Sequence, residues 1–190
     1  MQNLITTTTK NPNPQGKGCV PVLQDLAALR SHSPGPKSPG DILRDYCLSA
    51  LVLAAEFRFR PVPGQSYYLY SDEQEWKLSL IAPREWGARI PGQFVAKCCL
   101  RDDMTWQLDF GRFRADSSAA QRLQRFIDGF ASTISAQHSL LDALPFYASE
   151  LPYFQRILAT GQAGSLQHSI SEVGADRLRQ SLPLLSPALQ

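Results

Sequence analysis

The residues from Pro63 to Phe110 constrain the fold of this chain more than any other stretch. They contain all three tryptophans of the 190-residue chain and four short segments in which apolar and polar residues alternate. Side chains of a β-strand point to opposite faces in turn, so this two-residue period predicts strands. The segments are 66–71, 75–81, 93–101 and 105–110. We therefore expect a four-stranded β-sheet with one continuously apolar face.

The connections between these segments favour an antiparallel meander, in which each strand pairs with the next. Residues 71–75 and 101–105 are short and acidic, and aspartate side chains commonly bond backbone amides in hairpin turns. In the longer link 82–92, Pro83 suits the start of a helical turn and Gly87 suits its end. We expect one helical turn there, with Trp86 lying over an edge of the sheet.

A long helix is predicted just before the sheet. Ser38 suits the N-cap, Pro39 the first turn and Asp41 the positive end of the helix dipole. Apolar residues then recur at three- and four-residue steps as far as Phe57, and Pro61 ends the pattern. We expect the helix to cover the apolar face of the sheet, over Trp76, Leu78, Phe94 and Leu108.

Helices are also expected after the sheet. Asp116 suits the N-cap of one that carries an apolar stripe, and further helical segments are predicted at 140–144 and 151–158. The predicted fold class is therefore α+β, with a four-stranded antiparallel β-meander packed against a long N-terminal helix and with C-terminal helices. Composition divides the chain into a flexible N-terminal arm (1–18), a single α+β domain (19–165, sheet core 64–110) and a weakly helical tail (166–190).

Several of these residues together resemble a known family. The pattern comprises Pro63, Gly64, Tyr67, Tyr68, Leu69, Tyr70, Ser79, Ile81, Pro83, Glu85, Trp86, Gly87, Phe94, Asp103 and Trp106. It is similar to the widespread family called domain of unknown function 2452, which has bacterial and small eukaryotic members. The N-terminal NPNPQGKG segment resembles the longer bacterial members, which favours a bacterial source. The family has no known activity, so the resemblance implies no function.

Composition limits the classes of protein to which the chain can belong. The formal net charge of +2 is too small to favour nucleic acid or anionic lipid as a partner. No apolar run approaches the ~18 residues that span a bilayer, and the N-terminus lacks the apolar core of a signal peptide. The cysteines Cys19, Cys47, Cys98 and Cys99 lack CxxC spacing and suggest free thiols. These features predict a cytoplasmic protein that does not bind membranes.

No catalytic or metal-binding motif stands out from the sequence. The histidines His32, His138 and His168 share no helix face, and a serine-hydrolase elbow is absent, so we expect neither a metal nor a cofactor. Glu85, beside an indole, and Asp103, in a hairpin loop, are the two candidate acid/base residues. An enzyme that acts on a small molecule through either carboxylate is therefore one hypothesis.

Tyr68 and Tyr70 leave two further interpretations open. They lie near Lys77 and Lys97 on the second face of the predicted sheet, and aromatic and basic residues combine in this way on surfaces that stack single-stranded RNA. The near-neutral charge instead favours packing of both tyrosines beneath the helix predicted at 116–137.

The function that the sequence favours is a non-enzymatic binding or adaptor module. Its distinctive residues are aromatics, glycines and prolines, which shape a surface and do not transfer protons. We expect a recognition rim formed by Tyr68, Tyr70, Glu85, Trp86 and Arg89. The partner would be an unknown protein or a small-molecule ligand, and nucleic acid is disfavoured.

Overall fold

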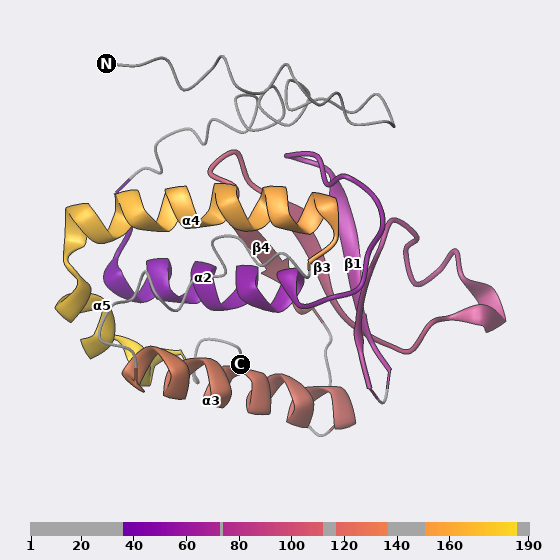
Figure 1. Cartoon of the computed structure of the whole chain (residues 1–190). Coiled ribbons are helices and arrows are strands. Elements are labelled where there is room, and N and C mark those ends of the chain that lie inside the picture. The colour runs from indigo at the N-terminus through magenta and orange to yellow at the C-terminus, as the bar shows by residue number, and fades with distance from the viewer. Residues whose placement is uncertain (1–35, 73, 112–116, 137–150, 186–190) are drawn as a thin grey trace, which may run out of the picture. The chain divides into compact units, whose positions relative to one another are not determined.

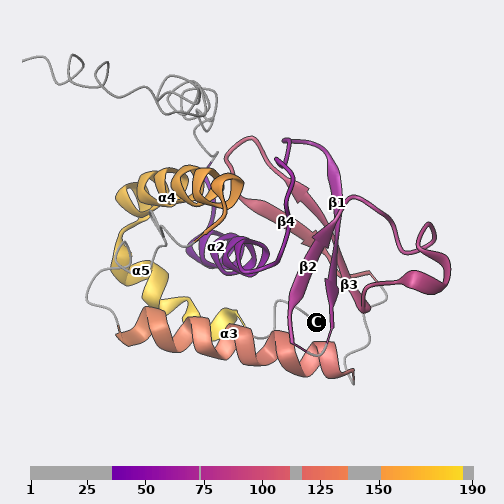
Figure 2. The same cartoon turned by 45° about the vertical axis from the view of Figure 1, so that its right-hand side comes forward.

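The computed structural model describes residues 36–72, 74–111, 117–136 and 151–185, all within one compact unit, Ser31–Gln190. In chain order its elements are α2 (Pro39–Leu53), β1 (Ser66–Ser71), β2 (Trp76–Ser79), the 3-10 helix η2 (Gly87–Arg89), β3 (Gln93–Leu100), β4 (Trp106–Asp109), α3 (Ser118–Ala136), α4 (Tyr153–Val173), α5 (Ala175–Gln180) and the 3-10 helix η3 (Leu182–Leu184). The predicted α+β class is confirmed by the N-terminal helix, the four-stranded antiparallel sheet and the C-terminal helices. Figures 1 and 2 show these helices on one side of the sheet and the β2–β3 link on the other.

The strand order departs from the predicted meander. The order is β2-β1-β3-β4, so β1 pairs with both β2 and β3, and β2 lies at an edge. Both tight hairpins form as expected, but the link 80–92 crosses β1 and places β3 on its far side. A short hairpin loop would hold β3 beside β2, whereas a link of this length is able to span a strand.

The two hairpin turns use the predicted aspartate chemistry. The Asp72 carboxylate accepts hydrogen bonds from the backbone amides of Gln74 (2.9 Å) and Glu75 (2.7 Å). In the β3–β4 turn, the Asp103 carboxylate accepts one from the amide of Thr105 (3.0 Å). Each turn is thus fixed by a side chain from within it.

A β-bulge decides which face of the sheet carries Phe94. The pairing of β1 with β3 shifts after Leu69, which lies opposite Ala96. The next residue, Tyr70, lies opposite Phe94, so Val95 is the extra residue of the bulge. The prediction that Phe94 lies beneath the N-terminal helix is therefore wrong, because strict alternation does not allow for the bulge.

Helix α2 ends earlier than its apolar pattern predicts. It stops at Leu53, whereas the pattern continues to Phe57, which is buried in an extended segment. The chain instead pairs with the outer edge of β2. The amide of Glu56 donates to the carbonyl of Trp76 (2.7 Å), and the amide of Leu78 donates to the carbonyl of Glu56 (3.0 Å). These bonds to the sheet replace the next turn of helix.

The start of α2 and its position over the sheet follow the sequence more closely. The Ser38 hydroxyl oxygen accepts a hydrogen bond from the amide of Asp41 (3.2 Å), as expected of an N-cap. In the middle of the helix, the Ser49 hydroxyl oxygen accepts one from the amide of Trp106 (2.9 Å). This bond holds α2 against β4, and Trp76 and Trp106 are both buried on the predicted apolar face.

Helix α3 packs on the same side of the sheet as α2. The Arg122 guanidinium donates to the carbonyls of Asp72 (3.0 Å) and Gln74, and it lies 5.0 Å from the centre of the Trp76 ring. Trp76 belongs to the apolar face, so the prediction that this helix covers the second face is wrong. The predicted cap Asp116 lies outside the described residues, as does 140–144.

Helix α4 begins after Pro152 as predicted and is much longer than predicted. It continues through two glycines to Val173, so the predicted boundary at 165 falls inside it. Gly161 permits this packing, because a Cβ there would lie 3.0 Å from the Met104 side chain. Further along the chain, Leu178 is buried in a cluster with Ile42 of α2.

The close approach of Gly92 to β1 gives a test of this fold. Gly92 has a φ of +135°, and a Cβ there would lie 2.5 Å from the carbonyl oxygen of Ser71. Gly87 also has a positive φ (+56°) but has open space around it. We expect Gly92→Ala to lower the free energy of unfolding by about 3 kcal/mol and Gly87→Ala by about 1 kcal/mol. Urea denaturation measures both, and equal losses would contradict the close approach.

Candidate functional site

A groove runs along the outer edge of β2. It is lined by the segments 56–59 and 77–81 together with Trp86 and Pro91, and we call this surface the edge groove. Phe57, Phe59 and Leu78 supply apolar surface from the body of the domain, and the link after β2 supplies the remainder. The groove is therefore mainly apolar, as ligand-binding surfaces generally are.

Large apolar side chains are exposed at the edge groove. Leu80 is 48% exposed, Ile81 is 38% exposed and the neighbouring Ile90 is 43% exposed. Within the described part of the chain, Val62 is the one other large hydrophobic residue with comparable exposure. Clustering of exposed apolar residues is typical of surfaces that bind other molecules.

The backbone of β2 is only partly paired along this groove. Hydrogen bonding alternates along an antiparallel ladder, so the polar groups of Trp76, Leu78 and Leu80 point away from β1. Glu56 satisfies the Trp76 carbonyl and the Leu78 amide. No described residue hydrogen-bonds to the Leu78 carbonyl or the Leu80 amide. Such a free edge is able to accept another strand.

The aromatic residues of the predicted rim occupy different positions. Trp86 lines the edge groove, and its ring meets that of Tyr70 edge-on at 6.2 Å between centroids. Tyr70 is completely buried, and its hydroxyl donates to the carbonyl of Ile81 (2.8 Å). Tyr70 therefore supports the link from beneath and cannot itself face a partner. Tyr68 is half-buried on the same face, 6.5 Å from the ring of Phe94.

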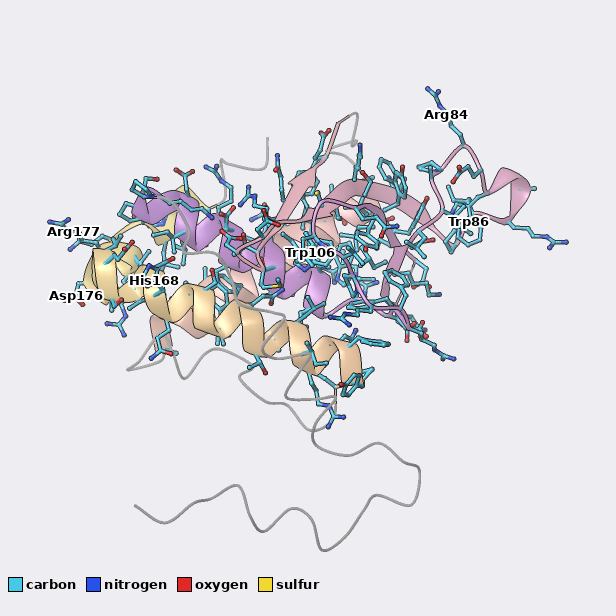
Figure 3. The ribbon with its side chains drawn as sticks, turned by 90° about the horizontal axis from the view of Figure 1, so that it is seen from above. Arg84, Trp86, Trp106, His168, Asp176 and Arg177 are labelled. Atoms are coloured by element: carbon cyan, nitrogen blue, oxygen red, sulfur yellow. The ribbon has the colours of Figure 1, made fainter. Side chains whose placement is uncertain are left out.

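The charged residues of the predicted rim lie in the link after β2. The Glu85 carboxylate accepts a hydrogen bond from the amide of Ala82 (2.8 Å), and the amide of Glu85 donates to the carbonyl of Ala82 (2.9 Å). Glu85 is thus a capping residue of the turn. Arg84 and Arg89 are exposed, and neither forms an ion pair with a described residue. Figure 3 shows Arg84 and Trp86 on the part of the link that extends furthest from the helices.

A buried network of charges lies at the β3–β4 turn. The Lys37 ammonium donates to the carboxylates of Asp45 (2.8 Å) and Asp103 (2.7 Å), and the Arg101 guanidinium donates to Asp45 (2.6 Å). Asp45 and Asp103 are only 8% and 7% exposed. Of these residues, only Asp103 is identified as a candidate from the sequence. The partners in the network lie up to 66 positions apart in the chain, so no local sequence pattern indicates that they meet.

The network holds Asp103 as a fixed anion. Burial alone would raise the pKa of Asp103, but hydrogen bonds from Lys37 and Thr105 outweigh burial and hold that pKa below its usual value. Burial would likewise lower the pKa of Lys37, but the bonds to the two carboxylates raise it. A carboxylate with this pKa shift is a poor proton donor, so the network joins the start of α2 to the sheet and does not suit acid/base chemistry.

A small polar cavity adjoins this network between α2 and α4. Its volume is about 20 Å³, and Asp45, Ser49, Gln162 and Ser165 are among its lining residues. The side-chain nitrogen of Gln162 is buried and has no hydrogen-bond partner among the described residues. A volume of this size holds about one water molecule, so the cavity is too small for an organic substrate.

The described part of the chain contains neither a metal site nor a helix that could span a membrane. No group of three His, Cys, Asp or Glu residues there has the spacing to hold a metal ion. The helices there lack the combination of length and apolar character that crossing a bilayer requires. Cys47, Cys98 and Cys99 are free thiols, and burial raises the pKa of Cys47 to about 12.

A protein-family model matches residues 39–128 of the chain. The family is described as "Protein of unknown function (DUF2452)". Residues 39–128 are therefore the part of the chain that is similar to DUF2452. This match confirms the resemblance found in the sequence motifs, and no solved structure matches the chain. The DUF2452 segment contains α2, the whole sheet and the edge groove, whereas the polar cavity also uses α4, which lies outside it.

Substitution of Lys37 tests the charge network at the β3–β4 turn. Lys37→Met leaves Asp45 and Asp103 buried without their shared cation, so we expect it to lower the free energy of unfolding at pH 7 by about 2–3 kcal/mol. Arg58→Met breaks an exposed pair with Glu56 (3.3 Å) and should change stability by less than about 0.5 kcal/mol. Urea denaturation gives both values, and similar losses would contradict a structural role for the network.

The same variant has a predicted pH dependence. Folding lowers the pKa of Asp103. The ionised Asp103 carboxylate therefore stabilises the folded state above the pKa that this group has in the unfolded chain, about 4. This stabilisation is lost as the pH falls through the pKa of Asp103 in the folded chain. The pKa of Lys37 is raised, so its stabilisation is lost only as the pH rises through a folded pKa above about 10.4. The stability difference between wild type and Lys37→Met should therefore shrink below about pH 4. A difference that stays constant from neutral pH down to acid unfolding would contradict this coupling.

Proposed function

We propose that the DUF2452-like domain of this chain is a binding module for another protein and that the edge groove is its contact surface. The observation that carries the proposal is the exposure of Leu80, Ile81 and Ile90 beside a strand edge with free polar groups. Burial of such side chains against a partner is favourable, because it removes apolar surface from water. Of the predicted rim, Trp86 lines this groove and Arg89 is exposed in the same link, which supports a contact with the partner.

The positions of the two candidate acid/base residues support binding over catalysis. The Glu85 carboxylate caps a turn, and the Asp103 carboxylate is held as an anion by Lys37 and Thr105. A general acid or base works best with a pKa near the working pH, whereas the pKa of Asp103 is shifted away from it. These roles account for both residues without an enzymatic activity.

The second face of the sheet gives little support to RNA binding. Tyr70 is buried, so Tyr68 is left as the one tyrosine of the pair with any exposed surface. Stacking of single-stranded RNA uses successive exposed aromatic side chains along a positively charged groove. Lys97 lies opposite Asp109 in the β3–β4 pairing, so this face also carries negative charge. A protein partner at the edge groove is therefore the better proposal.

We also propose that the protein is cytoplasmic and of bacterial origin. Cys47, Cys98 and Cys99 are unpaired, which supports the cytoplasmic location expected from the sequence. A bacterial source is supported by the motif resemblance. Neither expectation alters the choice of the contact surface.

Peptides selected from a random display library against the wild-type chain provide the test. We expect Leu80→Asp to weaken their binding at least about tenfold, because it places a charge in the apolar groove. Val62→Asp is the matched control, since Val62 is 49% exposed but does not line the groove. Fluorescence polarisation measures the affinities, and thermal unfolding verifies that both variants fold. Peptides that bind Leu80→Asp as well as wild type, or a selection that enriches none, would refute the proposed surface.

A further inference from the structure

We infer that the partner binds the edge groove as an extended peptide, with alternating apolar and acidic side chains, that adds a strand to the outer edge of β2. The inference rests on the proposed function, because it assigns the chemistry of a partner at the same surface. It draws on three separate features: the backbone groups of the groove, its fixed aromatic walls, and two arginines in the link after β2.

The backbone shows where an added strand would pair. Glu56 already forms a parallel bridge with β2 at Lys77. Continuation of that ladder would join Arg58 to the Leu78 carbonyl and the Leu80 amide, and these bonds are absent among the described residues. The chain thus begins to pair with β2 and then separates from it, and the edge groove lies between the two segments. An extended peptide in this position would supply the missing donors and acceptors.

The walls of the groove suit the side chains of such a strand. Trp86 is held by its edge-on contact with buried Tyr70, and Phe59 stacks on buried Tyr67 with ring centroids 5.4 Å apart and planes at 4°. Rigid apolar walls lose little conformational entropy when a ligand binds. Successive side chains of a strand point to opposite faces, and Tyr67 and Tyr70 lie on opposite faces of β1. The apolar row of an alternating peptide would therefore meet Phe59, and the other row would face the link that carries Trp86.

The charges around the groove select an acidic partner. Arg58 pairs with Glu56 (3.3 Å) and Lys77 pairs with Asp72 (2.7 Å), whereas Arg84 and Arg89 of the link after β2 are exposed and form no ion pair with a described residue. Carboxylates in the peptide would pair with these guanidinium groups. A second copy of this chain would carry the same positive rim, so charge complementarity favours an acidic peptide over self-association.

Peptides of defined sequence test the strand geometry. The parent probe is a short acetylated and amidated peptide in which valine and glutamate alternate, labelled with fluorescein. In a strand, the amides of successive residues point to opposite edges. N-methylation of the peptide amides that face β2 should therefore weaken binding at least about tenfold, whereas N-methylation of the amides on the other edge should leave the affinity unchanged. Replacement of glutamate by lysine should weaken binding to a similar extent.

Charge reversal in the protein tests the acidic preference independently. The double variant Arg84→Glu/Arg89→Glu should lose affinity for the glutamate peptide and gain affinity for the lysine peptide. Arg125→Glu is the matched control, because Arg125 is exposed on α3, which lies on the other side of the sheet from the link that carries Arg84 and Arg89 (Figures 1 and 2). It should bind both peptides as the wild type does.

The outcomes separate this inference from the proposed function. If both methylated peptides bind as the parent does while Leu80→Asp abolishes binding, strand addition is overturned and the contact surface stands. If Leu80→Asp has no effect on the peptide, the proposed surface itself fails. Absence of saturable binding of the parent peptide up to about 1 mM overturns the inference. So does Leu80-dependent binding to phosphatidylserine vesicles in place of the peptide, or a dimer in sedimentation that Leu80→Asp dissociates.

Discussion

The pairing of β1 with both β2 and β3 is the interaction on which the rest of this structure depends. Because β1 is an inner strand, β2 becomes an edge and the link after it has to cross β1. That crossing places Trp86 against Tyr70 and leaves Leu80 and Ile81 exposed beside the free edge. The edge groove is therefore a consequence of strand order and not an addition to the fold.

The opposite side of the sheet is fixed by polar contacts that span long stretches of sequence. Ser49 joins α2 to β4, Arg122 joins α3 to the β1–β2 turn, and Lys37 joins the start of α2 to the β3–β4 turn. Each contact satisfies a buried or half-buried polar group and so favours one arrangement of the helices. A well-fixed body of this kind suits a surface whose aromatic walls need little rearrangement on binding.

The sequence predicts most of the fold, because the signals it relies on are local. The period of two identifies all four strands, Ser38 marks the start of α2, and Asp72 and Asp103 mark the turns. The strand order, the bulge at Val95 and the end of α2 at Leu53 depend on contacts between distant segments, so periodicity does not predict them. In the candidate site, Trp86 lies over the sheet as predicted, whereas the burial of Tyr70 follows from the crossing link, which the sequence does not show.

On the outer edge of β2, the Leu78 amide is paired and the Leu80 amide is open. Amide hydrogen exchange of the unliganded chain, followed residue by residue by NMR, distinguishes the two. We expect slow exchange of the Leu78 amide, which donates to the Glu56 carbonyl, and exchange of the Leu80 amide close to that of an unstructured peptide. Equal protection of the two amides would show that the edge is already paired and would rule out an open edge.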